Sequence, residues 1–542
     1  MARRRLVRTF VFLSLLATAC AASADNIRDL QTKAVQTNAA PWGHWGPDAT
    51  KYSSWGSHSN RLIPVYSFGM DLSSMRGKES VYRNEDSLRK LYGYLPEGTL
   101  NPKAEYFDQT DVYRLQRAAA GQGKKCIVLI VFDGMDWQTT WAAAIAKSGK
   151  VGYRDGRGSG LHFQDYRGVK TDFGFFVTSP HDDGAKVDVD KQLFISPGSL
   201  RGGYHAESSG KAPWDAIADA NYPIGKGIKF KHDYADSASS ATSMTTGVKT
   251  YNDAINVDAL GRRFEPIARQ LQKSGYAVGA VTSVPISHAT PACAYANNLH
   301  RDDYQDLTRD MLGLPSISHP ATPLSGLDVL IGAGWGESSE KDTDQGKNFV
   351  SGNRYLTQGD LEAVDAQNSG KYIVAQRKKG ESGKQGLAKA AQEAVKNRQR
   401  LLGFFGVKSG HLPFQTADGR YDPTISVGQN PEVYSADDIS ENPTLADMTI
   451  AALNVLSSRS DRIWLIVEAG DVDWANHQNN IDNSIGAVLS GDEAFQAVAT
   501  WIEKNMGWDK SVVLVTSDHG HYLVLDRPEG LIDAGRAAPA GK

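Results

Sequence analysis

Residues 126–135 read CIVLIVFDGM, a continuous apolar run that ends in Asp133, Gly134 and Met135. Such a run, rich in β-branched residues, is typical of a strand buried on both faces of a parallel sheet. Similar runs lie at residues 277–282, 463–467 and 512–515, with helix-forming stretches between them. The sequence therefore predicts a three-layer α/β/α sandwich with a central, mostly parallel sheet. Ligands in such folds bind beyond the carboxyl ends of the strands, where Asp133 stands.

A second stretch, residues 236–242, reads DSASSAT and surrounds Ser237 with small residues. Small neighbours allow a bulky anion to approach closely, and the spacing that follows is compatible with a helix. Ser237 is therefore expected at or just before a helix N-terminus, where free N–H groups attract anions. The alternative interpretation is a serine that only caps a small-residue helix.

Two further segments place metal-ligand residues beside predicted strands. Glu468 directly follows the run at 463–467, and Asp473 and His477 come after it, four residues apart. On a helix that spacing puts a carboxylate and an imidazole on the same face. The last run is followed by Asp518, His519 and, two residues later, His521. Carboxylate and imidazole donors together suit zinc, whereas oxygen donors alone suit magnesium.

In order, spacing and residue type, residues 124–522 resemble the alkaline phosphatase family. The resemblance implies that Ser237 is a nucleophile that carries a phosphoryl group and that Arg301, eleven residues after Thr290, binds phosphate. The family's first zinc site maps to Asp133, Ser237, Asp518 and His519, and its second to Asp473 and His477. Its magnesium site maps to Asp133, Thr290 and Glu468. His288 stands where the family has the first residue of its magnesium-side pair, and His521 where a residue could orient another ligand.

The chain departs from the family at the second zinc site. The family completes this site with a histidine downstream of the Asp-His segment, but no histidine follows His521 here. Three alternatives are open: a truncated chain, a substitute donor within it, or a site that works with two protein ligands. His521 is the nearest substitute in sequence, and His205 and His232 are others with ordinary loop interpretations.

The termini and the remaining segments predict an exported, elaborated domain. Arg3, Arg4, Arg5 and Arg8, the apolar run to Ala17 and the small residues 22–24 predict a signal peptide over residues 1–24. Twin-arginine and lipoprotein signals are alternative forms of it. Residues 25–120 have no strong period and are expected to form an irregular accessory segment. The catalytic domain is expected over 121–542, with cap insertions at about 178–215 and 302–440.

The net charge of −3 argues against general nucleic-acid binding, which requires a basic surface. The apolar run near the N-terminus is too short to span a bilayer. Together with the predicted signal peptide, the resemblance implies a periplasmic or secreted enzyme that hydrolyses small phosphate monoesters through phosphoserine. The resemblance also implies a homodimer. The alternatives are a diesterase or sulfatase of the same superfamily, or an exported protein that binds phosphate or metal without turnover.

Overall fold

The alternating side chains of β5 (Cys126–Phe132) determine the centre of the fold. Cys126, Val128, Ile130 and Phe132 point into one buried cluster, and the residues between them point into another. All seven are 0% exposed. β5 is therefore buried on both faces, as its sequence predicts, and helices must cover both sides of the sheet.

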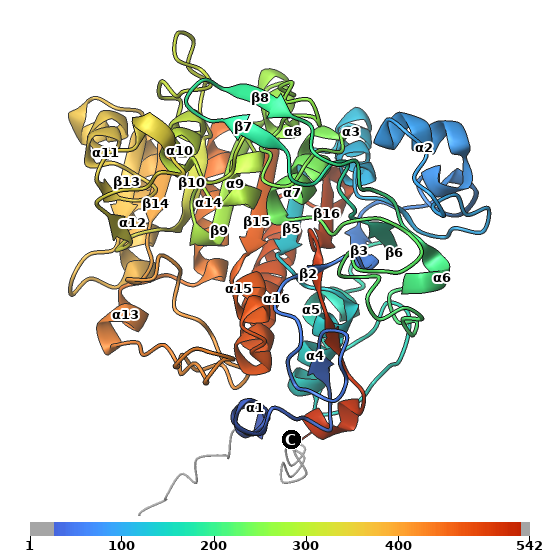
Figure 1. Ribbon diagram of the computed structural model, residues 1–542. Helices are drawn as coiled ribbons and strands as arrows, with labels where there is room; N and C mark the ends of the chain where they lie inside the picture. Colours follow the sequence, from blue (N-terminus) through green and yellow to red (C-terminus); the bar gives the residue numbers. More distant parts are fainter. Residues whose placement is uncertain (1–25, 533–542) are drawn as a thin grey trace, which may run out of the picture.

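The computed structural model describes residues 26–532, and the predicted signal segment 1–24 lies outside them. A ten-stranded sheet crosses the protein in the order β13-β14-β10-β9-β15-β5-β16-β3-β6-β4 (Figure 1). The strands from β13 to β16 in this order are parallel. β3 is antiparallel to both of its neighbours. The remaining strands of the sheet are β3 (Ile63–Phe68), β4 (Phe107–Asp108), β6 (Thr171–Val177), β9 (Ala277–Pro285), β10 (Val329–Ala333), β13 (Tyr372–Gln376), β14 (Arg400–Phe404), β15 (Ile463–Ala469) and β16 (Ser511–Thr516).

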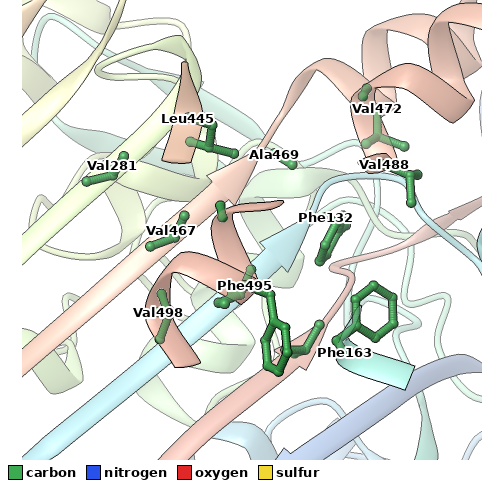
Figure 2. Packing of buried hydrophobic residues seen from close by; sticks show 14 of the residues in the cluster. Phe132, Phe163, Val281, Leu445, Val467, Ala469, Val472, Val488, Phe495 and Val498 are labelled. Atoms are coloured by element: carbon green, nitrogen blue, oxygen red, sulfur yellow. The ribbon is translucent and has the colours of Figure 1, made fainter. Parts of the chain in front are cut away.

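Helices form a layer on each face of this sheet, which confirms the predicted sandwich. One layer contains α4 (Trp137–Ser148), α12 (Gly383–Asn397), α14 (Leu445–Arg459) and α16 (Ile481–Asn505). The other contains α3 (Asp111–Gly121), α7 (Ser237–Thr246), α8 (Ile267–Lys273), α9 (Ala289–Cys293) and α10 (Tyr304–Leu312). Figure 2 shows part of the first interface, where Phe163 packs against both Phe132 and Phe495, with ring-centroid distances of 5.4 and 6.3 Å. Among residues 26–532, no helix has both the length and the apolar character needed to cross a bilayer.

Two segments contribute more to the sheet than their sequences predict. The N-terminal segment, expected to be irregular, supplies β3 to the sheet and the short strand β2 (His58–Ser59), which pairs with β17 (Gly520–His521). The segment 302–440, expected to be an insertion, supplies β10, β13 and β14 at one edge. The predicted insertion at 178–215 forms the hairpin of β7 (Lys186–Asp188) and β8 (Leu193–Ser196). Each strand added to the sheet joins it through backbone hydrogen bonds to a neighbouring strand. Such long-range contacts are not encoded in a local sequence pattern.

Candidate active site

The candidate site lies where the neighbouring strands β9, β15, β5 and β16 reach their carboxyl ends. Asp133 directly follows β5, Glu468 is the next-to-last residue of β15, and Asp518 lies two residues beyond β16. All three carboxylates are buried. Burial and the charges of Asp518, Asp473 and Glu468 raise the pKa of Asp133 well above its usual range. Such a group of buried carboxylates stays ionised only if a cation compensates it.

Ser237 is the first residue of α7 and is 1% exposed. The helix begins here because Asp236 caps it, accepting a hydrogen bond from the Ser239 amide at 2.8 Å. The Ser237 hydroxyl lies 3.4 Å from Asp133 Oδ1 and 3.2 Å from His519 Nε2. The predicted position at a helix N-terminus is confirmed, and the hydroxyl faces the strand ends.

We call Asp133, Asp518 and His519 the proximal cluster, because they are the metal-ligand residues beside Ser237. His519 Nε2 lies 3.2 Å from Asp133 Oδ1 and 3.5 Å from Asp518 Oδ2. Ligand atoms around a tetrahedral metal with bonds of about 2.0–2.2 Å are roughly 3.3–3.6 Å apart. Asp133 Oδ2 and Asp518 Oδ2 have no hydrogen-bond partner among the described residues. The spacing and the unpartnered oxygens fit a bound metal ion.

A second group, the distal cluster, consists of His58, Asp473, His477 and His521, whose ligand atoms lie within 4.8 Å of one another. The helix α15 (Asp471–His477) places His477 Nε2 3.5 Å from Asp473 Oδ2, as the spacing of four predicts. His521 Nε2 lies 2.7 Å from Asp473 Oδ1. Burial opposes the ionisation of Asp473, but His477, His521 and His58 lower its pKa well below the usual range.

His58 is the member of this cluster that the sequence analysis missed. Its Nε2 lies 3.0 Å from His477 Nε2, although the two residues are 419 positions apart in the chain. His58 belongs to no motif, and its neighbours Ser57 and Ser59 show no metal-ligand spacing. The pairing of β2 with β17 brings it to the site from far away in the chain, so no local signal could have identified it. His205 and His232 lie outside the cluster: His205 bonds to Ser208, and His232 to Asn60.

A third group of donors contains only oxygen atoms. Glu468 Oε1, Thr290 Oγ1 and Asp133 Oδ2 are buried and have no hydrogen bond of normal geometry among the described residues. Thr282 Oγ1 donates to the other oxygen of Glu468, a contact that the sequence analysis did not predict. Burial raises the pKa of Glu468 to about 7, while the Thr282 hydroxyl acts in the opposite direction. Carboxylate and hydroxyl donors of this kind suit a hard cation.

Arg301 and His288 lie beside the cap of α7. Arg301 Nη1 donates to Asp236 Oδ2 at 2.9 Å. Burial alone would raise the pKa of Asp236, but Arg301 and the Ser239 amide outweigh it and lower this pKa to about 2. Arg301 Nη2 lies 3.3 Å from His288 Nε2, which accepts because a guanidinium only donates. His288 is in neither group of metal-ligand residues found among residues 26–532. Its contact is therefore with Arg301, and not with the two clusters.

Comparisons with known proteins identify the family to which the chain belongs. The family model described as alkaline phosphatase matches residues 221–529, which are more than half of the chain. Alkaline phosphatase 4 of Bacillus subtilis is 27% identical over 293 residues, which cover 53% of this chain and 50% of that protein. Alkaline phosphatase of Escherichia coli is 29% identical over 309 residues, covering 55% and 61%. Alkaline phosphatase H of Pseudomonas aeruginosa is 29% identical over 304 residues, covering 54% and 59%.

The chain thus spans about half to three fifths of the length of these curated relatives. Among solved structures, the alkaline phosphatase of Thermus thermophilus is 19% identical, with a TM-score of 0.43 and coverage of 74% of this chain and 60% of that one. The matched region 221–529 contains Ser237, Arg301 and the donors from Glu468 to His521. With the family model matched over more than half of its residues, the chain belongs to the alkaline phosphatase family.

Proposed function

We propose that this protein hydrolyses phosphate monoesters through a phosphoserine intermediate on Ser237. The observation that carries the proposal is the convergence of Ser237 Oγ with Asp133 Oδ1 and His519 Nε2, at 3.4 and 3.2 Å. A serine oxygen at a helix N-terminus, beside unpartnered metal-ligand oxygens, is suited to attack phosphorus. Membership of the alkaline phosphatase family supports the same reaction.

We assign metal ions to the three donor groups by the chemistry of their atoms. The proximal cluster and Ser237 would hold one zinc ion, and Asp473 and His477 belong to a second zinc site, because nitrogen and carboxylate donors suit zinc. Asp133, Thr290 and Glu468 would hold magnesium through oxygen atoms alone. When bound, these ions would lower the pKa of the Ser237 hydroxyl and of water and offset the charge of the phosphate.

The residues of the chain then position the substrate for two displacements. Ser237 Oγ forms a bond to phosphorus as the bond to the alcohol oxygen breaks, and water later releases phosphate from the serine. The fork of the Arg301 guanidinium binds two phosphate oxygens at once. Asp236 holds Arg301 in this position through its hydrogen bond and caps the helix that carries Ser237. His288 contacts the same guanidinium, so we assign it a positioning role.

Replacement of the nucleophile tests the proposal. Ser237→Ala should lower turnover of p-nitrophenyl phosphate by more than about a thousandfold, the scale of lost nucleophiles. It should also abolish trapping of a phosphorylated protein at low pH. Ser240→Ala is the matched control, because Ser240 is buried in the same helix and its hydroxyl has no partner among the described residues. Turnover near the wild-type rate in Ser237→Ala would reject the mechanism.

Export, substrate class and assembly belong to the same proposal. The signal-like residues 1–24 support export to the periplasm or outside the cell. The net charge of −3 favours small phosphate monoesters over nucleic acid as substrates. We also propose a homodimer, which sedimentation of the metal-loaded protein at working concentration would detect as a doubled mass.

A further inference from the structure

The distal cluster needs one more protein donor than its motif supplies. Zinc sites in proteins have at least three protein ligands, and Asp473 and His477 provide two. We propose that His58, from the N-terminal segment, is the third protein ligand of the metal ion at this cluster. This role presupposes the metal-dependent function proposed above. His58 itself lies outside residues 221–529, which match the family model, so the match does not assign it.

The distances distinguish His58 from His521. His58 Nε2 lies 3.0 Å from His477 Nε2 and 3.5 Å from Asp473 Oδ1. His477 Nε2 lies 3.5 Å from Asp473 Oδ2. These separations approach the roughly 3.3–3.6 Å between ligand atoms of one tetrahedral ion. The 2.7 Å between His521 Nε2 and Asp473 Oδ1 is instead the length of a charge-assisted hydrogen bond.

The positions of the protons on the imidazole rings also distinguish a metal ligand from His521. His477 Nδ1 lies 2.8 Å from the Gly56 carbonyl oxygen, which only accepts, so Nδ1 carries the proton and Nε2 keeps its lone pair. By the same reasoning, His521 Nε2 donates its proton to the Asp473 carboxylate and has no lone pair left for a metal. His521 therefore orients Asp473, as outer partners of metal ligands commonly do. His477 can therefore direct its Nε2 lone pair at an ion, and His58 Nε2 lies 3.0 Å from that atom.

Backbone pairing fixes His58 in this position. In the ladder between β2 and β17, His58 is the partner of His521, so the proposed ligand and the residue that orients Asp473 lie side by side. The ring of His58 also packs on that of His519, with centroids 3.8 Å apart. His58 is 9% exposed, and its ring is thus held against the proximal cluster.

Asn479 connects the loop before His58 to the helix that carries the other ligands. It lies two residues after His477, with a φ of +49°, a conformation that asparagine tolerates better than most residues. Its amide donates to Ser53 Oγ at 2.6 Å and to the Trp55 carbonyl at 2.9 Å. The Trp55 indole in turn donates to the His58 carbonyl at 2.9 Å. The loop and the end of α15 therefore form one braced unit, which holds donors from both ends of the chain together.

Zinc retention in four forms of the full chain tests the assignment. Wild type, His58→Ala, His521→Ala and His44→Ala would be loaded with zinc and equilibrated against a series of chelator concentrations, and zinc per chain measured. His44 is the matched control, a buried histidine of the same segment that bonds to Asp526. His58→Ala should release one zinc ion at a free-zinc concentration at least about a hundredfold higher than the concentration at which wild type releases it. His521→Ala should fall within the roughly 10–100-fold loss expected for an orienting partner, and His44→Ala should match wild type.

His58→Cys adds a spectroscopic readout that does not depend on activity. Loaded with cobalt, this variant should gain a thiolate-to-cobalt charge-transfer band in the near ultraviolet, because only a direct ligand produces that band. Wild type is the reference, since Cys126 and Cys293 are buried and belong to neither cluster. Thermal melts in chelator would show that each variant folds.

The outcomes separate this assignment from the proposed function. A wild-type enzyme that turns over and holds two zinc ions, together with a His58→Ala variant that holds both equally tightly, would overturn only the role of His58. The absence of the band in folded, cobalt-loaded His58→Cys would do the same. A wild-type protein that binds no zinc and hydrolyses no monoester would overturn both.

Discussion

Ser237 Oγ lies 3.4 Å from Asp133 Oδ1, although 104 residues separate the two in the chain. Asp133 directly follows the central strand β5, and Ser237 begins α7 on one face of the sheet. The nucleophile and the carboxylate therefore meet because a helix N-terminus is packed against a strand end. Asp133 Oδ2, which has no hydrogen-bond partner among the described residues, indicates a cation site at the same strand end.

The first prediction follows from the charge of Asp133, and its sign depends on metal. Burial and the carboxylates of Asp518, Asp473 and Glu468 raise the pKa of Asp133 well above its usual range, so this carboxyl destabilises the metal-free fold at neutral pH, where the unfolded chain has released its proton. Asp133→Asn should therefore raise the melting temperature in excess chelator. In the presence of zinc and magnesium, Asp133→Asn should lower the melting temperature, because a metal ligand is lost. A shift of the same sign in both conditions would contradict this explanation.

The central part of this site was predictable because its signals are local. The buried runs that became β5, β9, β15 and β16 each encode a strand within a few residues, and the spacing of Asp473 and His477 encodes one turn of helix. When parallel strands lie side by side, the residues that follow them must meet. The four central strands, and the donors that directly follow them or lie on the next helix, follow from that reasoning.

The rest depends on contacts between distant segments. β3 includes Pro64 and Tyr66 and has no clear alternation, yet it pairs with β16 over Val65–Phe68. His58 reaches the distal cluster through the two-residue ladder with β17 and through the hydrogen bonds of Asn479 to the preceding loop. A donor delivered by a loop leaves no spacing pattern, which is why His521 was the nearest candidate in sequence and His58 was missed.

A second prediction concerns Arg301, whose guanidinium donates to Asp236 at 2.9 Å. Arg301→Lys keeps the charge but loses the fork that binds two oxygens. The KM for p-nitrophenyl phosphate should rise about tenfold, on the scale of one lost charge-assisted hydrogen bond, with a smaller change in kcat. Arg309→Lys is the control, because Arg309 bonds to Asp306 and Asp360. An unchanged KM in Arg301→Lys would remove the residue from the binding site.

A third prediction tests the packing of the long helix α16. A Cβ added at Gly486 would lie 1.8 Å from the Gln415 carbonyl oxygen, which is backbone and cannot turn aside. Gly486→Ala should therefore destabilise the protein by about 1–3 kcal/mol or more, as overpacked sites do. At Gly386 of α12, an added Cβ meets only the flexible Glu381 side chain. Gly386→Ala should instead stabilise by roughly 0.5–1 kcal/mol. Urea midpoints of the two variants would show whether their shifts have opposite signs.

The last prediction concerns Asp303, a buried carboxyl next to the predicted phosphate-binding Arg301. Burial and the charge of Asp306 raise its pKa to about 8, against a hydrogen bond from Asn298 at 2.7 Å. The unfolded chain releases this proton near pH 4, whereas the folded protein keeps it up to about pH 8. Asp303 therefore reduces stability progressively from about pH 4 to about pH 8, and the reduction is complete above that range.

Asp303→Asn removes this titration while it keeps the size of the side chain. The stability of the variant relative to wild type should rise between pH 5 and pH 9, by on the order of a few kcal/mol, since each pKa unit corresponds to about 1.4 kcal/mol. Urea midpoints at several pH values, with metals held constant, would measure the difference. Asp302→Asn, at the partly exposed neighbour, controls for the loss of one negative charge. A difference between Asp303→Asn and wild type that does not change with pH would show that Asp303 is ionised in the folded protein throughout this range.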